Sequence, residues 1–153
     1  MQAEDWMRLA LEEAVKDENE VPVGAVIEKD GQWIAAAHNE REKGSCFAHA
    51  EVLAMERACE KLGTRRLSGC TLYVTLEPCP MCAGAIVQAR IPRVVAGCMN
   101  PKAGCAGSVL NILNTPGLNH KVRFEKGVLE EECTKLLQDF FRELRRKGKK
   151  IEK

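Results

Sequence analysis

The feature that most constrains the fold is a strand-like run that stops at two closely spaced prolines. Residues 71–76 are leucine, valine, threonine or tyrosine, as in a buried strand. Pro78 ends this strand, and Pro80 suits the first turn of a helix, where no amide hydrogen is needed. The segment therefore predicts a strand that turns directly into a helix beginning near Cys79.

Two cysteines mark the start of that helix. Cys79 and Cys82 are three residues apart, so both sulfurs lie on one side of it. The exposed amides and the dipole at a helix N-terminus favour thiolate over thiol. His49 supplies a third metal ligand if the fold brings it near. Zinc held by two cysteines and one histidine keeps one position open, which distinguishes a catalytic zinc from a structural one.

Glu51 follows His49 by two residues and is a candidate proton-transfer group. Zinc lowers the pKa of a bound water to near 7, so a nearby carboxylate can take its proton. The same carboxylate can then protonate a ring nitrogen and a leaving amine. His-Ala-Glu at 49–51 and Pro-Cys-Pro-Met-Cys at 78–82 together match the zinc nucleobase-deaminase signature, in which the glutamate is not a ligand. The sequence thus predicts hydrolytic removal of an exocyclic amine from a base.

The same residues are open to other interpretations. An isolated His-x-Glu triplet is usually on the surface or caps a helix. A Cys-x-x-Cys pair can be redox-active, but that interpretation leaves His49 and Glu51 without a role. A structural zinc needs a fourth ligand. The cysteines available for it are Cys46, Cys70, Cys98 and Cys105.

Apolar periodicity and turn signals predict the remaining elements. Helices are expected over 4–17, 48–62, 79–89 and 129–147, and strands over 21–27, 32–37, 70–76, 93–97 and 121–125. Asp30-Gly31 is a hairpin signal. The Gly-, Asn- and Pro-rich stretch 98–119 is expected to be a long loop with a short helix at 108–113. This order predicts an α/β fold, a three-layer α/β/α sandwich with a mixed five-stranded sheet, in a single zinc-dependent deaminase domain over 1–153.

Composition and charge bear on location and partners. The chain is 45% apolar, and no apolar run nears the roughly 20 residues that cross a bilayer. The acidic N-terminus lacks signal-peptide features, so we expect a cytoplasmic protein with no membrane partner and with reduced cysteines. Residues 1–20 hold seven acidic and two basic side chains, and residues 142–153 hold seven basic and two acidic ones. Taken alone, a charged tail is usually a solvated surface, but beside a chemical site it favours a polyanionic partner.

Beyond the signature, the chain resembles the bacterial tRNA-specific adenosine deaminases, of the cytidine/deoxycytidylate deaminase superfamily, along nearly its whole length. The matching segments are 21–26, Asn39, 49–51, 71–85, 90–95, 104–108, 116–120 and 139–142. Generic cytidine deaminases are not expected to carry the last three together. The resemblance implies a cytidine deaminase-like fold, one Zn²⁺ per subunit, a homodimer, and conversion of the wobble adenosine of a tRNA anticodon stem-loop to inosine.

The resemblance also implies roles by position. Glu51 would be catalytic, and His49, Cys79 and Cys82 would bind the metal. The flipped base would meet Asn39, Val23, Ala50 and Pro78. Nucleic-acid contacts would come from Asn100, Lys102, Arg142, Arg145 and Arg146, with Lys149 and Lys150 extending the basic end.

Two departures from the family pattern are visible. Ser45-Cys46-Phe47 stands where the family often has Asp-Pro-Thr, next to the site. Asn100 stands where an acidic residue is common; loss of that charge reduces repulsion of phosphate and is expected to relax discrimination between RNA and DNA.

Two rival functions remain open. A zinc deaminase of a free base or nucleoside, of guanine or cytosine type, would use the same metal site but needs the basic helix and the long loop less. A non-catalytic zinc-stabilised RNA-binding module would leave Glu51 without a role.

Overall fold

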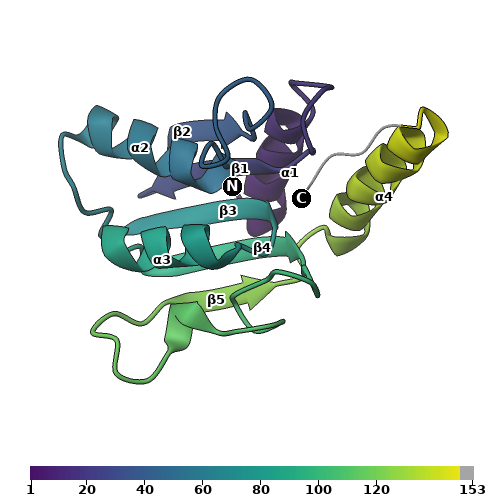
Figure 1. Ribbon diagram of the computed structural model, residues 1–153. Coiled ribbons are helices and arrows are strands. Elements are labelled where there is room, and N and C mark those ends of the chain that lie inside the picture. The colour runs from purple at the N-terminus through teal and green to yellow at the C-terminus, as the bar shows by residue number, and fades with distance from the viewer. Residues whose placement is uncertain (149–153) are drawn as a thin grey trace.

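The protein is built on one five-stranded sheet, seen in Figure 1, a computed structural model that describes residues 1–148. The strands are β1 (Gly24–Lys29), β2 (Gln32–His38), β3 (Cys70–Leu76), β4 (Arg93–Cys98) and β5 (Arg123–Lys126). The helices are α1 (Ala3–Ala14), α2 (Ala50–Leu62), α3 (Pro80–Ala89), α4 (Glu130–Arg146) and the short 3-10 helix η1 (Ile112–Asn114). The strand order is β2-β1-β3-β4-β5. β1 is antiparallel to β2 and β3, whereas β3, β4 and β5 run parallel, so the sheet is mixed as predicted.

Alternation along the strands sends side chains to two separate apolar layers. Val26, Tyr73 and Val95 lie in one row across the sheet and pack with α1 and α4, where the Trp6 ring stacks on Tyr73. The other face presents a larger buried set to α2 and α3. That set includes Ala25, Ile27, Leu72, Val74, Val94, Ala54 and Ile86. Helices therefore cover both faces, and the predicted three-layer α/β/α sandwich is confirmed (Figure 1).

Most element boundaries agree with the predictions to within three residues. The strand predicted over 21–27 begins at Gly24, because Pro22 has no amide hydrogen and the Val23 N–H bonds the carbonyl of Val21 instead of a neighbouring strand. The hairpin signal is confirmed: Asp30 and Gly31 have φ of 53° and 77°, the left-handed values that a tight turn of this kind needs.

The short helix predicted over 108–113 is wrong. Ala106 and Asn111 form an isolated bridge, and only 112–114 adopt a 3-10 turn. The Ile112 N–H donates to the Cys105 carbonyl (2.9 Å) and not to the Ser108 carbonyl, as a helix starting at residue 108 would require, so the segment follows a non-helical path.

No helix within residues 1–148 is long and apolar enough to cross a membrane.

Candidate active site

Two helix starts bring three metal donors together. His49 is the N-cap of α2, Cys79 is the N-cap of α3, and Cys82 lies in the first turn of α3. Both sulfurs lie 3.5 Å from Nδ1 of His49, and the three ligand atoms all lie within 4.8 Å of one another. Zinc bonds of about 2.3 Å to sulfur and 2.0 Å to nitrogen, at a tetrahedral angle, place the two atoms about 3.5 Å apart. The donors therefore fit a zinc ion in both chemistry and spacing.

Close approach of these donors perturbs their protonation. The hydrogen bond from the Cys82 thiol, followed by that from His49, lowers the pKa of Cys79 to about 4, although burial opposes this change. The bond with Cys79 in turn raises the pKa of His49. The pKa of Cys82 is raised by its bond to Cys79 and by burial. The cluster thus carries protons that a divalent cation would displace on binding.

Among residues 1–148, the only cluster of side chains placed to bind a metal consists of His49, Cys79 and Cys82. None of Cys46, Cys70, Cys98 or Cys105 joins it, so a fourth ligand for a structural zinc is lacking in this part of the chain. Cys79 and Cys82 are both free thiols rather than a disulfide.

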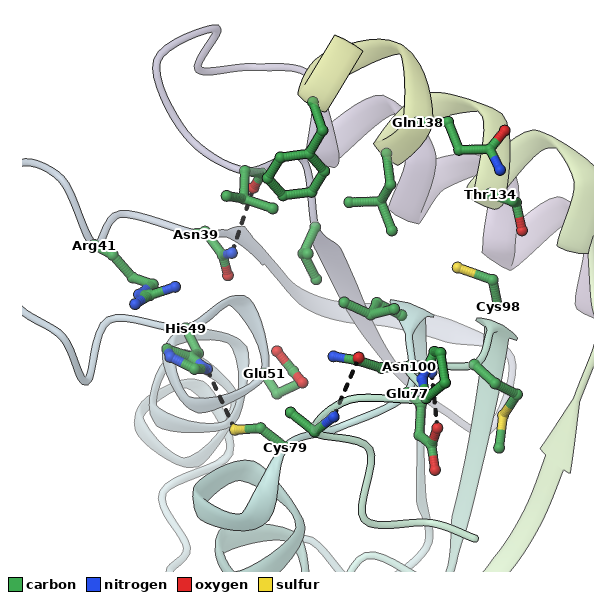
Figure 2. Close-up of a pocket in the computed structure, with 18 residues that line it drawn as sticks. Asn39, Arg41, His49, Glu51, Glu77, Cys79, Cys98, Asn100, Thr134 and Gln138 are labelled. Atoms are coloured by element: carbon green, nitrogen blue, oxygen red, sulfur yellow. Dashed lines mark hydrogen bonds between the residues drawn. The ribbon is translucent and has the colours of Figure 1, made fainter. Parts of the chain in front are cut away.

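Glu51 lies in the first turn of α2, next to the donors. Its side chain is 4% exposed and lines the same cavity as His49 and Cys79 (Figure 2). Burial raises the pKa of Glu51 to about 7. A carboxyl group with this pKa can both hold and release a proton near neutral pH, as a general acid–base group must.

The cavity beside Glu51 has a volume of about 370 Å³. One wall is formed by the segment before β1 and the end of β2, with Val23 and Asn39. The Asn39 side chain accepts a hydrogen bond from the Ala50 N–H (2.9 Å) and donates one to the carbonyl of Val21 (3.3 Å). Of the predicted substrate residues, Val23 and Asn39 line the cavity, Ala50 contributes a backbone amide beside it, and Pro78 precedes Cys79 with its carbonyl bonded to the Cys105 N–H.

The predicted nucleic-acid residues lie in two places. Asn100 is buried in the cavity wall, and its side-chain oxygen accepts the N–H groups of Lys102 (3.2 Å) and Ala103 (3.3 Å). Lys102 is exposed on the same loop. Arg142, Arg145 and Arg146 are exposed near the end of α4, where Asp139 pairs with Arg142 and Glu143 with Arg146. Lys149 and Lys150 lie outside the described residues.

Sequence reasoning missed two parts of the site. The first is a stripe of α4 that closes the cavity: Thr134, Leu137, Gln138 and Phe141 (Figure 2). Its spacing of three, four and seven residues was an available signal for one helix face. The second is Glu77, which is buried at the cavity; hydrogen bonds, first from the Ser108 hydroxyl, outweigh burial and lower its pKa. No periodicity marks Glu77.

Comparisons with known proteins agree with this geometry. Residues 1–145 match the family model of the MafB19-like deaminases, the class that the fold and the donor set define. A tRNA-specific adenosine deaminase of Bacillus subtilis is 52% identical over 155 residues, which cover 99% of this chain and 96% of that protein. The chain belongs to the MafB19-like deaminases, and its full-length relatives place it among the tRNA-specific adenosine deaminases.

Solved structures show the same relationship. One, from a study of A-to-I editing by tRNA:A34 deaminases at the wobble position, superposes with a TM-score of 0.83 at 43% identity, covering 87% of this chain and 99% of that one. A guanine deaminase from Nitrosomonas europaea superposes with a TM-score of 0.77 at 27% identity, covering 90% and 83%. The fold is therefore shared by deaminases of different substrates, and the identity is higher to the tRNA-editing structure.

Proposed function

We propose that the protein hydrolyses the exocyclic amine of the wobble adenosine in a tRNA anticodon stem-loop and leaves inosine. The observation that carries this proposal is the meeting of three metal donors and a buried Glu51 at one cavity. The tRNA substrate is supported by the full-length likeness to tRNA-specific adenosine deaminases.

In this proposal His49, Cys79 and Cys82 would hold one Zn²⁺ per subunit. The bound metal supplies a Lewis acid that activates water. Glu51 would take one proton from the attacking water and pass it to the ring nitrogen. It would then take the second proton, from the hydroxyl now on the carbon, and pass it to the amine as the C–N bond breaks and ammonia leaves. A pKa of about 7 suits both directions of transfer.

The neighbouring residues orient the base. Asn39 exchanges its longer hydrogen bond, the 3.3 Å bond to Val21, for one to the flipped adenine. Its shorter bond from the Ala50 N–H is kept and fixes the amide plane. Val23 packs on the base, and Pro78 keeps the backbone close to it. A flipped base is required because stacking hides the reacting carbon.

The rest of the tRNA meets the exposed cations. Arg142, Arg145, Arg146 and Lys102 contact phosphates, and Asn100 lies where the loop faces the nucleic acid. Replacing Asn100 with Asp introduces a carboxylate into the wall that faces the nucleic acid and is expected to raise the ratio of RNA to DNA activity. An unchanged ratio would contradict this role.

We infer a homodimer and a cytoplasmic location, where tRNA is found, for a single deaminase domain over 1–153. α2 and α3 leave a shallow groove that suits a contact with a second copy. Its apolar lining is Val52, Met55, Cys59, Ala85 and Ala89, and Glu56, Glu60, Arg65 and Gln88 also line it. Sedimentation of the wild type and of a Val52→Asp variant tests the dimer: a monomeric wild type contradicts it.

A zinc deaminase of a free base remains the second candidate, because the guanine deaminase shares the fold. The deciding assay incubates zinc-loaded protein with an anticodon stem-loop bearing a wobble adenosine, and in parallel with free adenosine, cytidine and guanine. Inosine in the stem-loop alone supports the proposal, whereas turnover of a free base or nucleoside alone overturns the tRNA assignment. Activity lost to a chelator and regained with Zn²⁺ tests the metal.

A further inference from the structure

Glu77 is a buried carboxylate with a hydrogen-bond network that the proposed chemistry does not use. It follows β3 directly and is 2% exposed. One carboxylate oxygen accepts the Asn100 N–H (2.9 Å) and the Ser108 hydroxyl (2.5 Å). The other accepts the N–H groups of Ala106 (2.9 Å) and Ser108 (3.0 Å). Four donors from one loop thus converge on a single side chain. Figure 2 shows the bond from Asn100.

That loop, residues 98–108, forms the cavity wall opposite Asn39. Met99, Asn100, Pro101 and Ala103 line the cavity from it. Further bonds join it to the chain around Glu77: the Glu77 N–H donates to the Cys98 carbonyl, and the Cys105 N–H donates to the Pro78 carbonyl, each at 2.8 Å. Gly104 packs so closely that an added Cβ would lie 2.0 Å from the Glu77 carboxylate. The loop is therefore built around Glu77.

The position of Glu77 in the chain couples this loop to the metal donors. Only Pro78 separates it from Cys79, and proline restricts the backbone on both sides of itself. The short segment 77–79 therefore does two things: Glu77 holds the loop in place, and Cys79 provides a metal donor.

We propose that Glu77 is a positioning residue that holds the 98–108 loop at the distance the flipped nucleotide requires, and so sets substrate affinity without taking part in proton transfer. The inference rests on the proposed function of the same cavity. It assigns to Glu77 an effect on KM, and leaves metal binding to His49, Cys79 and Cys82.

The network makes a sharp prediction for Glu77→Gln. The amide NH₂ group takes the position between Asn100 and Ser108, because the Ser108 hydroxyl can turn to accept while the other position faces two N–H donors. The remaining oxygen keeps its bonds to Ala106 and Ser108. The substitution therefore breaks mainly the bond to Asn100, the end of the loop that lines the cavity.

The test compares zinc-loaded Glu77→Gln, Glu77→Asp and Ser108→Ala with the wild type on the anticodon stem-loop. Loss of one buried hydrogen bond predicts a KM about 10-fold higher for Glu77→Gln, with kcat within about 3-fold and one zinc per chain. Glu77→Asp keeps the charge but is too short to reach all four donors, so its KM also rises. Ser108→Ala keeps the Asn100 bond, so its KM rises less. Ile27→Val, a core change away from the cavity, controls for general destabilisation.

Amide exchange measured by NMR adds a local readout. In Glu77→Gln the Asn100 amide should exchange faster while those of Ala106 and Ser108 stay protected. An unchanged KM, or zinc loss in parallel with activity, overturns the inference. If the wild type acts only on a free base, the proposed function fails instead. The KM values of the same variants on that free base then test the role of Glu77, because the loop lines the cavity that either substrate would enter.

Discussion

Replacing Glu51 with Gln tests two consequences of this buried carboxylate, its part in proton transfer and its effect on the free energy of unfolding. If Glu51 moves the protons, the substitution lowers kcat by about 10²- to 10⁴-fold, the usual contribution of a general acid–base group. That corresponds to about 3–5 kcal/mol of activation free energy. The zinc content is expected to stay at one per chain, because Glu51 is not one of the three donors.

The same substitution should stabilise the zinc-free protein. Burial raises the pKa of Glu51 from 4.5 to about 7. Between these pH values the folded protein keeps a proton that the unfolded chain has lost, so the free energy of unfolding falls as pH rises, by about 3 kcal/mol in all. A neutral glutamine has no such loss. Its advantage over the wild type therefore grows from about pH 4.5 to pH 7 and is constant above that.

The assay is urea unfolding of chelator-treated protein at pH 5 and pH 8, together with inosine formation by the zinc-loaded form. Glu12→Gln, an exposed change on α1, controls for the loss of one negative charge. The reasoning fails if Glu51→Gln keeps activity within a factor of ten of the wild type. It fails equally if the stability difference between variant and wild type is the same at both pH values.

Three further predictions concern packing, pH and salt. Gly97→Ala should lower the free energy of unfolding by about 1–3 kcal/mol, because its Cβ would lie 2.3 Å from a sulfur of α4. Gly84→Ala meets nothing within 4 Å and should raise it by up to about 1 kcal/mol; urea unfolding that shows the reverse order contradicts both. Hydrogen bonding to Arg93 lowers the pKa of Glu125, so this half-exposed pair stabilises above about pH 4.5 and its effect is lost as pH falls through the lowered value. Glu125→Gln should therefore cost about 0.5 kcal/mol in thermal unfolding at pH 7 and nothing at pH 2. Arg145→Gln should reduce the slope of log K against log salt for stem-loop binding by about 0.7, and an unchanged slope would remove Arg145 from the phosphate contacts.

The sequence was most informative where local rules act at the ends of elements. Pro78 and Pro80 mark a strand end and a helix start, so the donors Cys79 and Cys82 could be placed without tertiary information. The layers followed from the order of helices and strands, which periodicity and turn signals predicted. The strand at 21–27 was shifted because its apolar residues continue before Gly24, although Pro22 prevents pairing there.

Long-range hydrogen bonds were beyond sequence reasoning. The partners of Glu77 lie 23–31 residues further along the chain, and an acidic residue after a strand has no local signature. The helix expected at 108–113 failed for the same reason, since the Ile112 N–H donates to the Cys105 carbonyl, seven residues back, rather than to that of Ser108. The α4 stripe could have been recognised as one helix face, but not as a wall of this cavity.

The two loops that face the cavity are held by buried carboxylates. Glu20 is 3% exposed and accepts the N–H groups of Arg41 (3.0 Å) and Glu42 (2.7 Å), while Glu77 holds the loop opposite. Apolar packing in place of these bonds would fill the space that the base must enter, whereas hydrogen bonds to backbone fix a loop and leave that space open. The metal donors and Glu51 are thus positioned by the starts of α2 and α3, whereas the shape of the pocket is set by the two loops that Glu20 and Glu77 hold. Changes at the loop anchors, or at the 65% exposed Phe47 before His49, can therefore alter which nucleic acid is accepted while the deaminase signature stays intact.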